Sequence, residues 1–177
     1  PRQLSPQLAS LVAAPPSNGD WAYEPKFDGY RLLVRIDGDD VRCFTRTGKD
    51  WTDRLPALAE TIRSMNLGKA WLDGELVAIG ANGVPDFQAL QNAFDGRGTE
   101  ALDYFAFDLP CFDGYDLRDC ALSARRELLA SVLGKGAARV HFSESFDADP
   151  ASLLEAARRS GLEGLIGKRR GSPYRSR

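Results

Sequence analysis

The segment from Tyr30 to Arg46 constrains the fold most, because apolar and polar residues alternate on both sides of a short turn. Residues 30–36 read YRLLVRI, residues 37–40 read DGDD, and residues 41–46 read VRCFTR. A period of two residues is typical of β-strands, and two such runs joined by Asp-Gly predict an antiparallel hairpin. The same dipeptide predicts further turns at residues 28–29, 73–74, 95–96 and 113–114.

The remaining segments predict helices interleaved with more strands. The predicted helices are residues 52–66, 85–94, 122–133 and 150–161, and the predicted strands are residues 70–73, 75–79, 102–112, 138–142 and 164–169. We expect Thr52 or Asp53 to cap the first helix and Pro85-Asp86 to begin the second. Ser123 is the predicted cap of the third helix, and Gly161 closes the fourth. This order favours an α+β domain with mostly antiparallel sheets flanked by helices.

The composition is that of one globular domain. The chain has 177 residues, 43% of them hydrophobic and 27% charged, and no apolar run approaches the ~20 residues that span a bilayer. The start of the chain has no signal-peptide pattern, so we expect residues 1–20 to form an extended lead-in. Cys43, Cys111 and Cys120 form no C-x-x-C pair and are expected to be reduced thiols. His141, the one histidine, lies in a predicted strand and is interpreted as structural.

Charge is concentrated at the end of the chain. The formal net charge is -2, yet residues 167–177 (GKRRGSPYRSR) carry only basic charges. Such a segment is either a solvated tail or a contact for a phosphate backbone, and its composition leaves both open.

With histidine and cysteine set aside, catalytic chemistry must come from lysine, arginine and carboxylates. Lys26 is followed by Asp28, Gly29 and Arg31 in KFDGYR, and the spacing alone leaves open a reactive centre or a hairpin with charged strands. A lysine is a nucleophile only when neutral, so its pKa of ~10.4 must fall through desolvation and neighbouring cations. Mg²⁺ prefers carboxylates, for which Glu75 and Glu163 are candidates. A purine needs an aromatic face, which Phe107 or Phe105 could supply.

Five short motifs resemble those of the covalent nucleotidyltransferases, which comprise ATP-dependent DNA ligases, RNA ligases and mRNA capping enzymes. In chain order they are KFDGYR (residues 26–31), TRTG (45–48), LDGEL (72–76), YFAFDLPCFDG (104–114) and LEGLIGKR (162–169). One such motif is weak, but five in the family's order across nearly the whole chain are a specific signal. Residues 21–38, 85–94 and 171–176 look most like the ligase domain of the bacterial end-joining DNA ligases that work with Ku.

The resemblance implies the residue roles. Lys26 would take AMP from ATP as a phosphoramidate and pass it to a DNA 5′-phosphate, and Asp28 and Arg31 belong to the same motif. It further implies that Glu24 lies beside the adenine, that Phe107 stacks on the purine, and that Arg31 and Arg46 reach the ribose or phosphates. Glu75 would contact the sugar and support Mg²⁺ or Mn²⁺, Glu163 would help hold the metal, and Lys168 would approach the nucleotide.

The resemblance also implies the organisation and the partners. We expect the ATP-grasp-like fold of DNA ligase adenylation domains over residues 21–177, ending before the last nucleotidyltransferase motif and the OB-fold domain. The fragment is then expected to be weak or inactive in complete ligation, with an uncovered sheet edge and a mobile basic tail. Implied partners are double-stranded DNA with nicks or ends, Ku, and polymerase or nuclease modules. The protein is expected to be a monomer in the bacterial cytoplasm, associated with the nucleoid and not with a membrane.

Two alternative functions remain open at this point. An RNA ligase or a capping-type enzyme uses the same lysine chemistry on an RNA end or with GTP. A catalytically silent nucleic-acid-binding module would use the basic strands only as a phosphate track.

Overall fold

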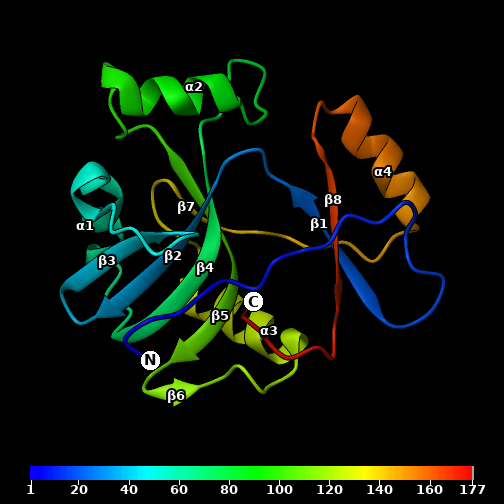
Figure 1. Ribbon diagram of the computed structural model, residues 1–177, viewed down its shortest axis with the longest axis horizontal. Helices are drawn as coiled ribbons and strands as arrows, with labels where there is room; N and C mark the ends of the chain where they lie inside the picture. Colours follow the sequence, from blue (N-terminus) through cyan, green and yellow to red (C-terminus); the bar gives the residue numbers. More distant parts are fainter. Residues whose placement is uncertain (177) are drawn as a thin grey trace.

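The computed structural model describes residues 1–176, which form two β-sheets with helices around them (Figure 1). The larger sheet has six strands in the order β3-β2-β4-β5-β6, with β7 paired to β5, and the smaller sheet pairs β1 with β8. Every pairing is antiparallel except that of β5 with β7, which confirms the predicted class. The strands are β1 Trp21–Lys26, β2 Tyr30–Asp37, β3 Asp40–Thr45, β4 Lys69–Val77, β5 Asp103–Phe112, β6 Tyr115–Asp116, β7 Val140–Phe142 and β8 Gly164–Arg169.

The predicted hairpin of β2 and β3 is confirmed. Asp37 faces Asp40 across the turn, and Gly38 has a φ of 62°, as the turn requires. One face of these strands buries Leu32, Val34 and Ile36 in the main core. The period-two pattern therefore placed the core face of the larger sheet correctly.

The Asp28-Gly29 pair does not make a hairpin, because β1 and β2 lie in different sheets. β1 pairs with β8, so that Lys26 lies opposite Gly164, while β2 pairs with β3 and β4. Residues 27–29 instead carry the chain from the smaller sheet to the larger one. A Cβ at Gly29 would lie 2.2 Å from the carbonyl oxygen of Leu76, so only glycine fits there.

Replacing Gly29 with alanine is expected to lower the free energy of unfolding by about 1–3 kcal/mol, because the clash is with backbone of the central strand β4. Urea denaturation of the purified chain measures the change. Gly171→Ala is the matched control, since a Cβ there meets no atom within 4 Å. Equal losses in the two variants would contradict the close approach at Gly29.

A turn at Asp73-Gly74 was predicted wrongly. β4 runs unbroken from Lys69 to Val77, and its register with β5 shifts on both sides of Asp73. Gly74 is needed because a Cβ would lie 2.4 Å from the carbonyl oxygen of Phe105. Asp95-Gly96 leaves the helical conformation within Ala93–Arg97, with a φ of 110° at Gly96, and Asp113-Gly114 joins β5 to β6, so turns occur at both of these predicted positions.

The helices lie where they were predicted, but two of them begin differently. They are α1 Pro56–Ser64, α2 Phe87–Asn92, α3 Leu122–Leu133 and α4 Pro150–Arg159. Thr52 lies in a 3-10 turn and accepts a hydrogen bond from the Cys43 amide, so neither it nor Asp53 caps α1. The N-cap of α3 is Ala121, not Ser123. Asp86 caps α2 as predicted, and Gly161, with a φ of 78°, follows α4.

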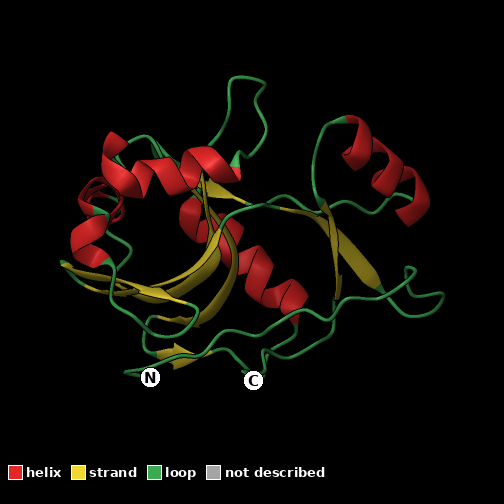
Figure 2. Cartoon of the chain, turned by 45° about the horizontal axis from the view of Figure 1, so that its top comes forward, coloured by secondary structure: helices red, strands yellow, loops and turns green. Residues whose placement is uncertain are grey.

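The two ends of the described chain lie together, as Figure 2 shows. Residues 1–20 contain no helix or strand. The amide of Gln7 donates to the Tyr174 hydroxyl at 3.3 Å, and the Arg175 amide donates to the Gln7 side chain at 3.2 Å. Because Tyr174 is only 2% exposed, the prediction of a mobile basic tail is wrong for the residues before Arg177, which lies outside the described residues. Across residues 1–176, none of the helices has both the length and the apolar character that crossing a bilayer requires.

Candidate active site

A pocket of about 420 Å³ lies between the two sheets and collects most of the predicted site residues. β1 contributes Glu24 and Lys26, and the central strands β2, β4 and β5 contribute one predicted side chain each. The predicted residues that line it are Glu24, Lys26, Arg31, Glu75, Phe107 and Lys168. Residues from both sheets therefore meet around one cavity of the size that small-molecule ligands occupy.

Lys26 lies at the end of β1 with its amine in an ion pair. Its Nζ is 2.7 Å from Oε1 of Glu163, which immediately precedes β8. The pairing of β1 with β8 produces this contact between residues 137 positions apart. The Lys26 side chain is 43% exposed, so the protein by itself does not provide the desolvation that we expected around this amine.

Arg31 is held by a carboxylate that the sequence analysis did not identify. Its Nε and Nη2 each donate to Asp73 at 2.6 Å, and Nη2 also donates to the Gln7 carbonyl oxygen at 2.8 Å. Asp73 is fully buried and also accepts a hydrogen bond of 2.7 Å from the Tyr174 hydroxyl. Burial alone would lower the pKa of Arg31, but the charge and hydrogen bonds of Asp73 raise it. The guanidinium is thus a fixed cation in the pocket wall.

Phe107 presents its ring to two cations. Nζ of Lys168 lies 4.1 Å from the ring centroid, and the guanidinium carbon of Arg31 lies 4.8 Å from it. Nζ of Lys168 is also 2.8 Å from Oε2 of Glu24, which is only 2% exposed. Among the described residues, the Lys168 ammonium is the one partner of this Oε2, and a carboxylate oxygen has a second lone pair with which it can accept from a ligand.

Glu75 has the strongest perturbation among the predicted carboxyl groups. Burial raises its pKa from 4.5 to about 7, the nearby charge of Arg31 opposes this, and the charges of Asp73, Glu163 and Asp28 add to it. The side chains of Glu75 and Glu163 are therefore close enough to repel each other. Such a carboxyl in a pocket marks a candidate functional group.

Glu75 and Glu163 could supply some, but not all, of the ligands that a divalent cation needs. A cation would relieve the repulsion around Glu75, and Mg²⁺ needs only one or two carboxylates when water and phosphate oxygens complete its shell. The part of the chain that the structure describes contains no group of three or more His, Cys, Asp or Glu residues arranged to hold a metal ion. A metal here would thus depend on oxygen ligands from a bound nucleotide.

Glu75→Gln is expected to stabilise the fold by about 2–3 kcal/mol at pH 8 and by almost nothing at pH 4. With its pKa raised to about 7, the folded protein binds a proton that the unfolded chain has lost above about pH 4.5. Wild-type stability must therefore fall as the pH rises from about 4.5 to 7, and a neutral glutamine avoids that loss. Urea denaturation across this range measures the difference, and exposed Glu127→Gln is the control. A difference between Glu75→Gln and wild type that is constant with pH would contradict the shift.

Three predicted residues lie outside the pocket lining, and one of them, Glu163, contacts it through the ion pair with Lys26. Arg46 is exposed in the turn that follows β3, and Asp28 is exposed between the two sheets, where its charge still affects Glu75. Phe105, the alternative purine face, stacks on Phe27 with ring centroids 4.4 Å apart and is not in the lining. His141 pairs with Asp103 at 2.7 Å, in agreement with a structural role.

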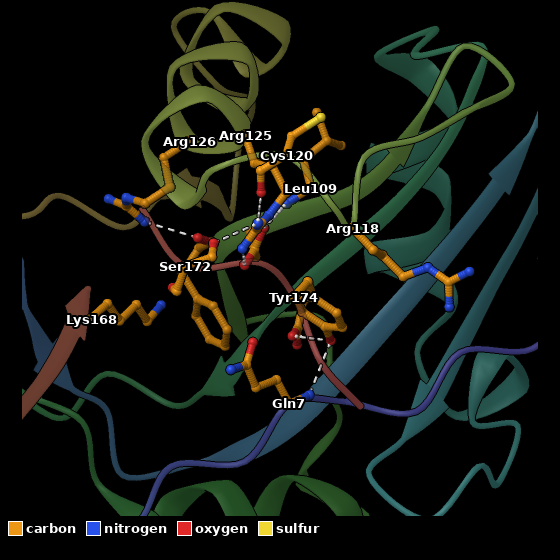
Figure 3. A network of polar contacts seen from close by, with 12 residues as sticks. Gln7, Leu109, Arg118, Cys120, Arg125, Arg126, Lys168, Ser172 and Tyr174 are labelled. Atoms are coloured by element: carbon orange, nitrogen blue, oxygen red, sulfur yellow. Dashed lines mark hydrogen bonds and ion pairs between the residues drawn. The ribbon is translucent and has the colours of Figure 1, made fainter. Parts of the chain in front are cut away.

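The sequence analysis missed two arginines that anchor this pocket from α3 (Figure 3). Arg125 is 2% exposed and forms two hydrogen bonds to Asp108, of 2.8 and 3.0 Å. Arg126 is 7% exposed and lies 3.2 Å from Oε1 of Glu24. Both arginines lie in the predicted helix of residues 122–133, where sequence alone does not show that they are buried, and a buried arginine needs a partner.

Comparisons with known proteins find relatives over nearly the whole chain. Residues 6–177 match the family model described as "ATP dependent DNA ligase domain". The chain is 53% identical over 179 residues to "Multifunctional non-homologous end joining protein LigD" of Pseudomonas aeruginosa, covering 100% of this chain and 21% of that protein. A Mycobacterium tuberculosis LigD is 37% identical over 172 residues, covering 97% of this chain and 22% of its own length. The chain thus spans about a fifth of these curated relatives.

Solved structures show the same fold. The ligase domain of M. tuberculosis LigD matches with a TM-score of 0.76 and 38% identity, over 88% of this chain and 50% of that one. A mycobacterial DNA ligase D complexed with ATP and MES matches with a TM-score of 0.80 and 35% identity, over 98% of this chain and 56% of that one. The fold is that of DNA ligase adenylation domains, as the motifs implied. This chain belongs to the ATP-dependent DNA ligase domain family.

Proposed function

We propose that this chain binds ATP in the pocket between its sheets and forms a covalent lysyl-AMP on Lys26. The observation that carries the proposal is the position of Lys26 at a pocket of about 420 Å³. The predicted residues that also line this pocket are Phe107, Arg31, Lys168, Glu24 and Glu75. A mycobacterial relative has been solved in complex with ATP, which supports ATP as the nucleotide. The amine, the ring and the charges are what nucleotidyl transfer requires.

In the proposed step, Nζ of Lys26 attacks the α-phosphorus of ATP. A nitrogen–phosphorus bond forms, the bond from the α-phosphorus to the oxygen that bridges to the β-phosphate breaks, and pyrophosphate leaves. The lysine ammonium gives up two protons in the process. Oε1 of Glu163, 2.7 Å from Nζ, is placed to accept the first of them, and solvent takes the second.

We propose that each pocket residue contacts a different part of the nucleotide. Phe107 is proposed to stack on the purine and Glu24 to lie beside the adenine, where Oε2, paired among the described residues only with Lys168, can accept a hydrogen bond. Lys168 must leave the ring face for the purine to stack there, and its charge is then available to the phosphates. Arg31 and Glu75 are proposed at the ribose and phosphates, and Arg46 and Asp28 stay predictions from their motifs.

Glu75 and Glu163 are the residues that would hold Mg²⁺ or Mn²⁺. When bound, such an ion supplies positive charge that stabilises the negative charge developing on the phosphate oxygens. Glu163 contributes through its ion pair with Lys26, and Glu75 contributes from the pocket wall, within reach of the charge of Glu163.

The activity of the whole protein is proposed by analogy with the relatives. AMP would pass from Lys26 to a DNA 5′-phosphate, and a 3′-hydroxyl would displace it and seal the break. The P. aeruginosa and M. tuberculosis relatives are named for non-homologous end joining, which supports DNA ends or nicks as the substrate and DNA repair as the setting. Ku, polymerase or nuclease modules, a monomeric state and a cytoplasmic, nucleoid-associated location in a bacterium are proposed on the same basis.

Incubation of the purified chain with ATP or GTP labelled on the α-phosphate tests the proposal. We expect label on the protein from ATP, a mass increase of one AMP, and loss of the label when pyrophosphate is added. Label from GTP alone would support a capping-type enzyme instead. No label from either nucleotide, together with DNA binding, would support the silent nucleic-acid-binding module and overturn the proposal.

A further inference from the structure

We propose that Arg126 is a positioning residue that sets the purine slot and thereby the preference for a 6-amino purine. The inference rests on the proposed function, and it concerns a residue outside the five motifs. Arg126 lies on α3 and reaches the pocket only through other groups.

Arg126 makes three polar contacts from a buried position. Its Nη1 donates to the carbonyl oxygen of Phe107 at 2.9 Å and lies 3.2 Å from Oε1 of Glu24. Its Nη2 donates to the carbonyl oxygen of Ser143 at 2.6 Å. The flat guanidinium carbon also lies 4.7 Å from the centroid of the Phe142 ring. Few rotamers can satisfy all of these contacts, so the side chain is fixed.

These contacts link the two walls of the proposed purine slot. Glu24 lies on β1 in the smaller sheet, whereas Phe107 lies on β5 in the larger sheet, and the two sheets share no strand pairing within residues 1–176. Ser143 also belongs to the larger sheet's side, because its amide donates to the Ala106 carbonyl oxygen at 2.8 Å. Arg126 therefore holds the carboxyl group of one wall at a set distance from the ring of the other.

Arg126 also gives the two oxygens of Glu24 different partners. Oε1 lies near Arg126 and accepts a hydrogen bond of 3.3 Å from the Ser143 hydroxyl. Oε2 lies 2.8 Å from the Lys168 ammonium, which is its one partner among the described residues. An ionised carboxylate only accepts hydrogen bonds. Once Lys168 moves from the ring face to the phosphates, Oε2 in the slot thus favours a purine whose position 6 carries a donor amine over one that carries an oxygen.

The adjacent Arg125 provides a matched control. Figure 3 shows the two side chains leaving α3 in different directions, with Arg125 directed toward Ser172. Arg125 is also buried, at 2% exposed against 7% for Arg126, and it lines the pocket itself, but its partners are Asp108 and the carbonyl oxygens of Cys120 and Ser172. Loss of either arginine should destabilise the fold, whereas only Arg126 contacts Glu24.

The experiment measures Lys26 labelling with ATP and with inosine triphosphate, which has an oxygen at position 6, in wild type, Arg126→Met, Arg126→Lys and Arg125→Met. For Arg126→Met we expect the ratio of kcat/KM for ATP over inosine triphosphate to fall about tenfold or more, through a higher KM for ATP. The rate at saturating ATP, per folded molecule, should stay within about twofold. Arg126→Lys should recover part of the ratio, because it restores a charge but not the forked donors.

Calorimetric binding of both nucleotides to the same folded variants gives the ratio without the covalent step. A wild type that binds ATP selectively but forms no adduct would therefore defeat the proposed function while still testing Arg126. An unchanged ratio in both Arg126 variants would overturn the inference. An equal fall of the ratio in Arg125→Met would overturn it as well, since the effect would then follow from general loosening of α3.

Discussion

Replacing Lys26 with alanine is expected to abolish the covalent addition of AMP to the chain entirely. The proposed adduct is a bond to Nζ of this residue. Its amine lies 2.7 Å from Glu163, which is placed to accept a proton from it. Lys168, the second amine, is held against Glu24 and Phe107. Intact mass spectrometry after incubation with ATP measures the adduct, which should fall below detection.

One further variant distinguishes loss of the nucleophile from loss of the ion pair, and another is an exposed control. Lys26→Arg keeps a cation beside Glu163, but a guanidinium stays protonated and cannot attack phosphorus. We therefore expect wild-type stability and no adduct. Lys135→Ala removes an exposed lysine after α3 and should leave the adduct unchanged. An adduct that persists in Lys26→Ala, located by peptide mapping, would transfer the role of nucleophile to another residue.

Local patterns predicted the strands and helices well but not how the first strand pairs. The β2–β3 hairpin follows from neighbours in the chain, whereas β1 pairs with β8 more than 130 residues away. Asp-Gly is a short-range turn signal, so it could not distinguish a hairpin from the passage between two sheets at Gly29. At Gly74 the same dipeptide continues a strand, because the space beside Tyr104 and Phe105 excludes a side chain. Long-range packing decides both cases.

The motifs predicted most of the residues that line the pocket, but not the buried residues that hold them in place. Six of the nine predicted site residues line it, and Glu163 joins them through its ion pair with Lys26. Asp73, Tyr174 and Arg126 were missed because their roles depend on burial, which the sequence does not display. Charged residues are mostly exposed in proteins, so the sequence predicts an exposed Asp73. Only the fold shows that Asp73 is fully buried beside Arg31.

Asp73→Ala is expected to cost about 3–5 kcal/mol of unfolding free energy, because it leaves the buried guanidinium of Arg31 without its partner. Asp73 accepts two hydrogen bonds of 2.6 Å from Arg31 and one of 2.7 Å from Tyr174. Asp73→Asn, which keeps the shape and one acceptor, should cost less. Urea denaturation of both variants beside wild type measures these differences.

The control for Asp73 is a carboxylate that pairs with arginines at the surface. Asp40 lies 3.4 Å from Arg35 and 3.1 Å from Arg42 with half of its side chain exposed, so Asp40→Ala should cost less than about 1 kcal/mol. Because Arg31 also holds the Gln7 carbonyl oxygen, Asp73→Ala should release residues 1–20 to proteolysis before the core unfolds. Similar costs for the two variants, or unchanged protection of residues 1–20, would contradict a role for Asp73 in joining the chain ends to the active-site wall.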